Sequence, residues 1–520
     1  MQRKNKMANT TNRSDVLIAG AGPTGLVLAL WLVRQGVTVR IIDKTAEPGT
    51  TSRALAVQAR TLELYRQLDL TDEVLQQGHR VPGVNLWVQG KKQAHVSFDT
   101  IADGLTPYGP FIFPQDLHER LLIARLEKRG VSVERNMELV CFDESDGGIV
   151  ATLRRSDGVE ETCEAAYLAG CDGARSVVRQ ITGTGFPGGT YHQVFYVADV
   201  DAAGPSVDGD LHVDLDEADF LAVFPMKGEG RARLIGTVRD ERAEHAESLT
   251  FEDVSDRAIE QMKIDVRKLN WFSTYRVHHR VTEHFRKGRA FLLGDAAHIH
   301  SPAGGQGMNT GIGDAINLAW KLKAVLAGQA SDAILDTYET ERRAFAQKLV
   351  ATTDRGFTLA TAEGRVAEFM RTRIVPIVVP TLFRFEASRE FMYRAVSQIS
   401  VNYRDSALSK GDAGHVRGGD RLPWAPVAGA DNFDTFRIIG WQLHVYGTCS
   451  PDLLSWCTQH DLRLCVFPWN DGYETSGLTK DAIYLLRPDT YIALAAEQQD
   501  LQILGSYIAE RGLSPGSGTD

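Results

Sequence analysis

The sequence predicts an α/β fold built around a parallel sheet. An apolar strand at 15–19 leads into the glycine-rich turn Gly20 to Gly25, and after a helical segment the next strand ends in Asp43. Far along the chain, the apolar run 290–293 leads into a second glycine-rich loop and helix. Between them, β-branched and aromatic residues alternate over 191–280, which is typical of an antiparallel sheet. These observations predict a Rossmann-like domain with an inserted antiparallel sheet.

The first glycine turn, GAGPTG, has the spacing of a dinucleotide-binding fingerprint. Gly20 permits the tight turn, Gly22 lets a pyrophosphate approach the backbone, and Gly25 lets helix and strand pack closely. Asp43, at the end of the second strand, can accept hydrogen bonds from ribose hydroxyls. The turn predicts a site for an ADP moiety, although the fingerprint alone does not separate FAD from NAD.

The second glycine loop, GDAAHIHSPAGGQGMN, extends from Gly294 to Asn309. Asn309 and Thr310 are candidate caps for the helical pattern that follows. A strand, a loop poor in side chains and a helix N-terminus form a site where a flat anionic ligand can touch backbone N–H groups. Read alone, the loop is equally compatible with a glycine-rich surface turn.

A third motif lies between these two, in the segment YLAGCDGARSVVR. A short apolar strand ends at Cys171, and Asp172 and Gly173 precede the start of a helix. An ordinary Asp-Gly turn is the alternative interpretation. The presence of the other two motifs favours a functional one.

Together the three motifs resemble those of the class A, single-component FAD-dependent aromatic hydroxylases of the phenol-hydroxylase type. The resemblance implies that Asp295 binds the ribityl chain, that Asp172 lies near the pyrophosphate, and that Arg53 and Gln115 contact the cofactor. The full set of cofactor-binding residues that it implies is Gly20, Gly22, Thr24, Gly25, Asp43, Arg53, Gln115, Leu139, Asp172, Gly294, Asp295, Pro302, Gly305, Gly307, Met308 and Asn309.

The same resemblance implies the reaction. In this family NADH or NADPH reduces FAD transiently, and a flavin C4a-hydroperoxide formed with O2 hydroxylates a small phenolic or other electron-rich aromatic substrate. Such a species loses H2O2 to water, so the site must be dry. Pro302 would stand beside the reacting edge of the flavin, and Gly305 would let the ring lie flat. His212, Phe224 and Tyr403 are candidates for lining the substrate pocket.

Composition limits the other classes of function. A formal net charge of −10 disfavours nucleic acid or an anionic membrane as the main partner. The longest apolar stretch is interrupted by Gly and Pro, so we expect no membrane span. The six cysteines form no CxxC pair and no zinc-like cluster, which predicts no metal and a cytoplasmic protein. A homodimer remains open.

The predicted organisation has one domain interrupted by another. The segment 416–520 resembles the thioredoxin-like C-terminal domain of phenol-hydroxylase-type enzymes, without its redox CxxC. The expected segments are 1–190 and 286–355 for the FAD-binding domain, 191–285 for the substrate sheet, 356–415 for a helical wall of the pocket, and 416–520 for the linker and C-terminal domain.

Two alternatives stay open. One is a monooxygenase that tailors a larger polycyclic polyketide or antibiotic, since the same architecture serves both substrate classes. The other is a redox-inactive FAD-binding protein. The substrate, the ring position, the general base and the choice between NADH and NADPH are not readable from the residues.

Overall fold

The computed structural model describes residues 13–49, 54–98, 104–145, 147–215, 220–238, 249–254, 256–301, 305–361, 378, 381, 385–427 and 430–516. Two predicted site residues, Arg53 and Pro302, lie outside the described residues.

A mixed sheet forms the centre of the molecule, in the order β17-β18-β11-β1-β2-β8. Strands β1, β2, β11 and β18 run parallel, and their segments in the core, such as 16–19 and 290–292, are apolar, as expected for a parallel sheet that is buried on its faces. Strand β1 pairs directly with both β2 and β11. A hairpin of β9 and β10 extends from β11. The strands are β1 (Arg13–Ala19), β2 (Val39–Asp43), β8 (Glu134–Arg135), β9 (Met137–Ser145), β10 (Gly148–Arg155), β11 (Glu160–Gly170), β17 (Arg286–Lys287) and β18 (Ala290–Leu292).

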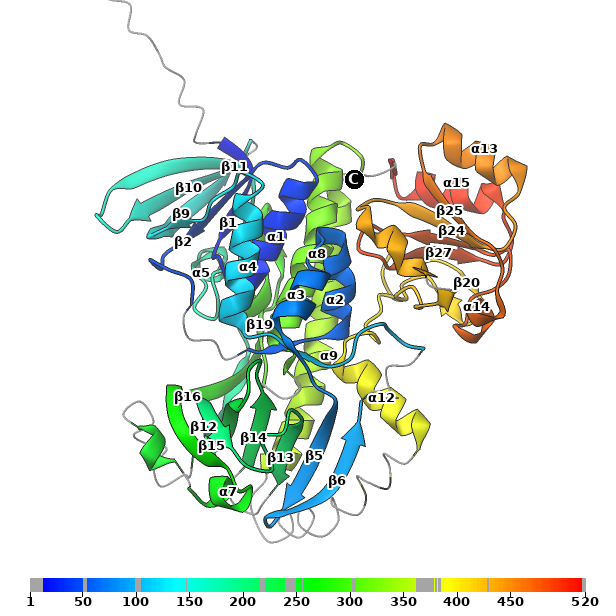
Figure 1. Ribbon diagram of the computed structural model, residues 1–520. Helices are drawn as coiled ribbons and strands as arrows, with labels where there is room; N and C mark the ends of the chain where they lie inside the picture. The colour runs from blue at the N-terminus through cyan, green and yellow to red at the C-terminus, as the bar shows by residue number, and fades with distance from the viewer. Residues whose placement is uncertain are drawn as a thin grey trace, which may run out of the picture.

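Helices α1 and α8 pack against each other beside this sheet (Figure 1). Helix α9 packs on α8 and buries Tyr338, Arg342 and Ala346. The helices of this part are α1 (Pro23–Arg34), α2 (Ala59–Tyr65), α3 (Thr71–Gln77), α4 (Gln115–Glu127), α5 (Val177–Thr182), α8 (Gly307–Leu326), α9 (Asp336–Thr361) and α12 (Glu386–Val396).

The antiparallel sheet predicted over 191–280 is confirmed for strands β12 to β16, which belong to a larger sheet in the order β19-β16-β12-β15-β14-β13-β5-β6, where β13 and β5 pair in parallel. Its last two strands come from 83–97, a segment to which the sequence pattern assigned no strand. One face packs on α7 (Asp256–Gln261), and the other packs on the small sheet β3-β7-β4. The strands are β3 (Ala56–Val57), β4 (His79–Arg80), β5 (Gly83–Val88), β6 (Lys91–Ser97), β7 (Phe111–Ile112), β12 (Gly188–Ala203), β13 (Leu211–Leu215), β14 (Phe220–Pro225), β15 (Arg231–Val238), β16 (Asp265–Val281) and β19 (His298–Ile299).

The C-terminal part has its own four-stranded sheet, in the order β25-β24-β26-β27 (Figure 1). Strands β24 and β25 are parallel, and β26 and β27 are antiparallel to their neighbours. Its elements are β24 (Gln442–Tyr446), α13 (Pro451–Gln459), β25 (Arg463–Phe467), α14 (Asp471–Thr475), β26 (Ile483–Leu486), β27 (Ile492–Ala496) and α15 (Leu501–Glu510), preceded by the short pairs β20 (Asp412–Ala413) with β21 (Val416–Arg417) and β22 (Pro426–Val427) with β23 (Ala430–Asp431).

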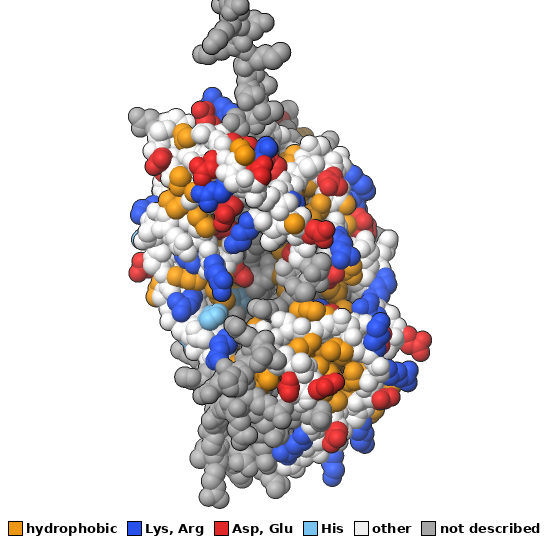
Figure 2. Space-filling view, turned by 90° about the vertical axis from the view of Figure 1, so that its left-hand side faces the viewer, with side chains coloured by type: hydrophobic (Ala, Val, Ile, Leu, Met, Phe, Trp, Pro, Cys, Tyr) orange, Lys and Arg blue, Asp and Glu red, His pale blue; other side chains and the backbone are white. Residues whose placement is uncertain are grey.

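The surface carries both signs of charge. Figure 2 shows acidic and basic side chains interspersed with apolar ones over one face of the molecule. Within the described part of the chain, no helix is both long and apolar enough to cross a membrane. The described residues also contain no group of three or more His, Cys, Asp or Glu side chains placed to hold a metal ion.

Candidate functional site: a nucleotide cradle and an uncapped helix

The first glycine turn is held tightly against the third motif. Gly20 has a φ of +102°, and a Cβ added there would lie 2.2 Å from the carbonyl oxygen of Cys171. A Cβ on Gly25 would lie 2.0 Å from the carbonyl oxygen of Gly20. Gly22 differs, because a Cβ there would meet nothing within 4 Å. Open space therefore adjoins the N-terminus of α1, where a phosphate is stabilised.

Asp43 holds this turn in place through a hydrogen bond to its backbone. Its Oδ2 accepts a hydrogen bond from the backbone N–H of Ala21 at 2.7 Å, and its Oδ1 accepts one from Thr45 N at 2.8 Å. Arg135 lies 3.7 Å from the same carboxylate. The side chain predicted to bind ribose thus also shapes the loop that would receive the pyrophosphate.

Thr24 joins the first and second motifs. A Cβ on Gly294 would lie 2.7 Å from the Thr24 hydroxyl oxygen, and a Cβ on Gly311 would lie 2.3 Å from it. The hydroxyl therefore fits between two glycines, one in the turn after β18 and one in α8. The fold brings together two glycine-rich motifs that are far apart in the chain.

Asp172 has one oxygen committed and one without a partner. Its Oδ2 accepts hydrogen bonds from the backbone N–H groups of Val177 and Val178, at 2.7 and 3.1 Å, and so fixes the start of α5. Its Oδ1 is buried and has no hydrogen-bond partner among the described residues. Because a buried acceptor without a partner is costly, this oxygen suits a ligand donor.

The turn that carries Asp295 is held by Asp314, which the sequence reading missed. Asp314 Oδ2 accepts hydrogen bonds from Gly294 N at 3.0 Å and from His298 Nε2 at 2.6 Å, and its Oδ1 accepts one from Arg342 Nε at 2.6 Å. Burial alone would raise the pKa of Asp314, but Arg342 and His298 outweigh it and hold that pKa below its usual value. An acid within the apolar stripe of the predicted helix was the signal that could have identified it.

Helix α8 begins at Gly307, two residues before its expected cap. Asn309 does not cap it, which corrects the sequence-based assignment. The Asn309 side chain instead accepts hydrogen bonds from Gln58 N and the Thr61 hydroxyl, and donates to the carbonyl oxygens of Ala56 and Gly305. Any contact between Asn309 and a cofactor is therefore left to its backbone.

Gly305 is required for a different reason from the one expected. It has a φ of +61°, and a Cβ there would lie 2.6 Å from the Cβ of Ala56 on β3. The glycine thus lets the second loop approach β3, rather than only leaving a flat face for a ring.

Replacing Gly305 with Ala should destabilise the protein by about 2–4 kcal/mol, from left-handed backbone strain plus the clash with Ala56. Gly328→Ala is the matched control, because Gly328 also has a positive φ (+68°) but a Cβ there meets nothing within 4 Å. Urea denaturation of both variants measures the difference. Equal losses would show that the contact with Ala56 is unimportant.

The contacts of Gln115 and Leu139 do not decide whether these two residues bind the cofactor. Gln115 Nε2 donates to Glu119 Oε1 at 2.7 Å, and Glu119 Oε2 accepts from Gly49 N at 3.2 Å. Burial raises the pKa of Glu119. Leu139 packs in the main core on β9. The cofactor roles of Gln115 and Leu139 stay predictions.

The structure separates the three candidate substrate residues. His212 pairs with Val223, and its Nδ1 accepts a hydrogen bond from Trp87 Nε1 at 2.9 Å. Because successive strand residues point to opposite faces, His212 lies on the face away from Phe224. The prediction that His212 lines a pocket with Phe224 is corrected.

The prediction that Tyr403 lines the same pocket as Phe224 is also corrected. The Tyr403 hydroxyl accepts a hydrogen bond from Arg342 at 2.8 Å, and its ring centroid lies 4.3 Å from that of Tyr491. Tyr403 thus lies between α9 and the C-terminal sheet, in a different apolar cluster from Phe224.

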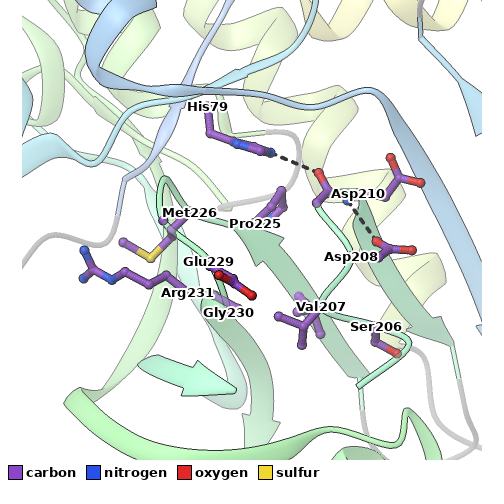
Figure 3. Close-up of a pocket in the computed structure, with 14 residues that line it drawn as sticks. His79, Ser206, Val207, Asp208, Asp210, Pro225, Met226, Glu229, Gly230 and Arg231 are labelled. Atoms are coloured by element: carbon purple, nitrogen blue, oxygen red, sulfur yellow. Dashed lines mark hydrogen bonds between the residues drawn. The ribbon is translucent and has the colours of Figure 1, made fainter. Parts of the chain in front are cut away.

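A cavity of about 360 Å³ lies at one end of the large sheet (Figure 3). His79 Nε2 donates to the carbonyl oxygen of Gly209 at 3.1 Å across its rim, and Pro225 and Met226 contribute apolar surface. Its lining includes none of the described residues of the three motifs. We therefore do not assign this cavity to the cofactor.

Comparison with known proteins decides the family. A family model described as "FAD binding domain" matches residues 13–353, which is more than half of the chain. The chain belongs to this FAD-binding family. It is 31% identical over 506 residues to a flavin-dependent monooxygenase of Mycobacteroides abscessus, covering 93% of this chain and 97% of the relative.

Two further relatives differ in the substrates that their names state. A 12-dehydrotetracycline 5-monooxygenase/anhydrotetracycline 6-monooxygenase of Streptomyces rimosus is 32% identical, covering 93% of this chain and 95% of that protein. Pentachlorophenol 4-monooxygenase of Sphingobium chlorophenolicum is 31% identical, covering 79% and 76%. The solved structure of the anhydrotetracycline hydroxylase OxyS from Streptomyces rimosus superposes with a TM-score of 0.77 at 29% identity, covering 96% of this chain and all of that one.

This FAD-binding protein is accordingly an FAD-dependent monooxygenase of the class A aromatic hydroxylase type. The residues present fit FAD: the space beside Gly22 admits a phosphate, and the first turn of α8 presents backbone N–H groups. NAD(P)H is the electron donor typical of this family.

Replacing Asp295 with Ala should abolish FAD retention while the fold survives. Asp295 is exposed in the turn after β18, so its loss would remove the predicted ligand group without opening the core. Visible flavin absorbance of the purified variant measures occupancy, and Glu138→Ala, an exposed carboxylate on β9, is the control. A variant with full flavin occupancy would refute the role assigned to Asp295.

Proposed function

We propose that this enzyme uses NAD(P)H and O2 to hydroxylate a phenolic or other electron-rich aromatic substrate. The supporting observation is an apolar, aromatic cluster on the face of the large sheet that includes Phe220, Phe224 and Tyr275. Ala56 of β3 belongs to this cluster and also contacts Gly305 of the second glycine loop (Gly294 to Asn309), called the flavin loop below. The flavin loop and the aromatic face are therefore neighbours.

The chain's own contribution is to bind, orient and exclude water. Bound FAD, once reduced, supplies the activation of O2 and the transfer of one oxygen atom to the ring. The aromatic face offers apolar surface and edge-on contacts for a flat substrate, which would complete the exclusion of water. In the balanced reaction, one oxygen atom enters the ring and the other leaves as water, while NAD(P)H is oxidised to NAD(P)⁺.

A polycyclic substrate is the second candidate, and the share of this chain that each relative matches favours it. The tetracycline-acting relative matches 93% of this chain, including the C-terminal part, whereas the pentachlorophenol relative matches 79%. We propose that a polycyclic phenol is accepted at least as well as a single-ring one.

Steady-state NAD(P)H oxidation by the yellow holoprotein tests the proposal. The panel contains simple phenols, salicylates and polycyclic phenols, with mass spectrometry of the products. Stimulated oxidation with a gain of one oxygen atom on a panel member establishes hydroxylation, and its identity chooses between the two substrate sizes. If flavin is bound but no panel member stimulates NAD(P)H oxidation, the result would favour the redox-inactive FAD-binding alternative.

We further propose the finer assignments made from the sequence. The C-terminal sheet order supports a thioredoxin-like domain, and the segment boundaries 1–190, 191–285, 286–355, 356–415 and 416–520 are kept as proposals. The roles of Arg53 and Pro302 beside the flavin, a cytoplasmic location and a homodimer are likewise proposals. The six cysteines are all free thiols, which supports a reducing compartment.

A further inference from the structure

His300 has a nitrogen that the established site does not use. It follows β19, the short strand that pairs with the end of β16. His300 Nε2 is shielded from solvent and has no hydrogen-bond partner among the described residues. A Cβ added to Gly307, the first residue of α8, would lie 3.7 Å from this nitrogen. The unpartnered nitrogen therefore lies beside the first turn of the helix that follows the flavin loop.

The tautomer of His300 can be deduced from its other nitrogen. Nδ1 lies 2.8 Å from the carbonyl oxygen of Ser301, so Nδ1 carries the proton and donates. Burial lowers the pKa of His300 to about 4, so the ring is neutral near neutral pH. Nε2 is then a lone-pair acceptor, and a buried acceptor without a donor costs free energy.

The neighbouring helix end supplies the opposite chemistry. Within the described residues, no side chain caps the N-terminus of α8. The N–H groups of its first turn, from Gly307 onward, lack partners within the helix and are donors. An acceptor and several donors side by side complement an imide edge, in which one N–H is flanked by two carbonyl oxygens.

We propose that His300 Nε2 accepts a hydrogen bond from the imide N–H of the FAD ring system. That N–H is the single ring N–H of oxidised flavin, and the α8 donors beside it match a flanking carbonyl. The inference rests on the FAD site and not on the aromatic substrate, so it is tested without turnover. A substrate hydroxyl is the other donor that could reach this nitrogen, and the experiment separates the two.

The test is a cycle with two cofactors and two proteins. Apoprotein of the wild type and of His300→Leu is titrated with FAD and with FAD methylated at the imide nitrogen, which cannot donate. We expect methylation to weaken binding to the wild type about 10-fold, His300→Leu to weaken FAD binding about 10-fold, and methylation to cost His300→Leu little more. His300→Gln, which retains an acceptor, should restore part of the discrimination.

His415→Leu controls for loss of an exposed histidine and should match the wild type. An equal methylation penalty in the wild type and in His300→Leu overturns the proposal. If that equality is accompanied by a higher Kd of His300→Leu than of the wild type for a polycyclic phenol at saturating FAD, the donor is the substrate hydroxyl, and the assignment to the flavin is wrong. Flavin binding that follows the expected pattern without any substrate-stimulated turnover would support His300 and count against the proposed function alone.

Discussion

Replacing Glu341 with Gln should lower the free energy of unfolding by about 3–5 kcal/mol, the cost of breaking a buried ion pair. Glu341 on α9 is 4% exposed and accepts hydrogen bonds from Lys321 Nζ at 2.8 Å and from Arg487 NH1 and NH2 at 2.7 and 3.0 Å. Ser406 also donates to it at 2.6 Å. The neutral amide would leave two cations in the interior with too little negative charge.

Urea denaturation measures this loss, with Glu510→Gln as the control. Glu510 lies 3.3 Å from Lys410 in an exposed pair, so its substitution should cost under about 1 kcal/mol. Equal losses in the two variants would contradict the expectation.

Low pH should destabilise the wild type by protonating the same carboxylate, that of Glu341. Burial alone would raise the pKa of Glu341, but Arg487 and Lys321 outweigh it and hold that pKa well below its ordinary value. A carboxylate with a depressed folded-state pKa stabilises the fold above its unfolded pKa, and that stability is lost as the pH falls. The wild type should therefore lose stability below about pH 4.5 more steeply than Glu341→Gln does.

The second large effect is the contrast between two glycines of the first turn. Gly22→Ala should keep the fold, because its Cβ meets nothing within 4 Å, and yet raise the Kd for FAD on the order of 100-fold by filling the space that a pyrophosphate needs. Gly20→Ala should cost about 2–5 kcal/mol of stability, because its Cβ would lie 2.2 Å from Cys171 O at a positive φ.

Titration with FAD and thermal unfolding of the apoproteins separate the two variants. Gly22→Ala with unchanged FAD affinity would mean that the open space beside α1 is not the phosphate site. Gly20→Ala with wild-type stability would show that the turn can relax away from Cys171.

The sequence was sufficient where the signal was local. Strand β1, the turn after it and α1 follow one another in the order that the glycine spacing requires, and periodicity identified the large antiparallel sheet. It failed where a distant segment decides the outcome. His212 could not be assigned to a face, because that face is defined by Trp87 on β5, and Tyr403 could not be placed, because its neighbour Tyr491 comes from the C-terminal part.

Within the site, the motifs do not reveal which distant residues hold each position in place. Gly305 has a positive φ and a close neighbour, Ala56, which no pattern links to it, and its predicted place beside the flavin ring stays a prediction. Asp314 was missed because an acid in an apolar helical stripe is normally read as an irregularity, and because its donors lie 16 to 28 residues away from it, two in the second glycine loop and one on α9.

The contacts of Arg487 bear on how far this enzyme is modular. Arg487 and Asp489 come from the loop between β26 and β27, and they form one buried ionic cluster with Lys321 and Glu341 of the FAD-binding part, two cations with two carboxylates. A chain truncated before the C-terminal sheet would keep the 1:1 pair of Lys321 and Glu341 but uncover it, together with the Trp320 ring over which Arg487 lies, and should aggregate. Chimeras between relatives should fold only when this loop is exchanged together with α8 and α9. The segments that must be kept together are therefore those that share the ionic cluster, and they do not coincide with one domain.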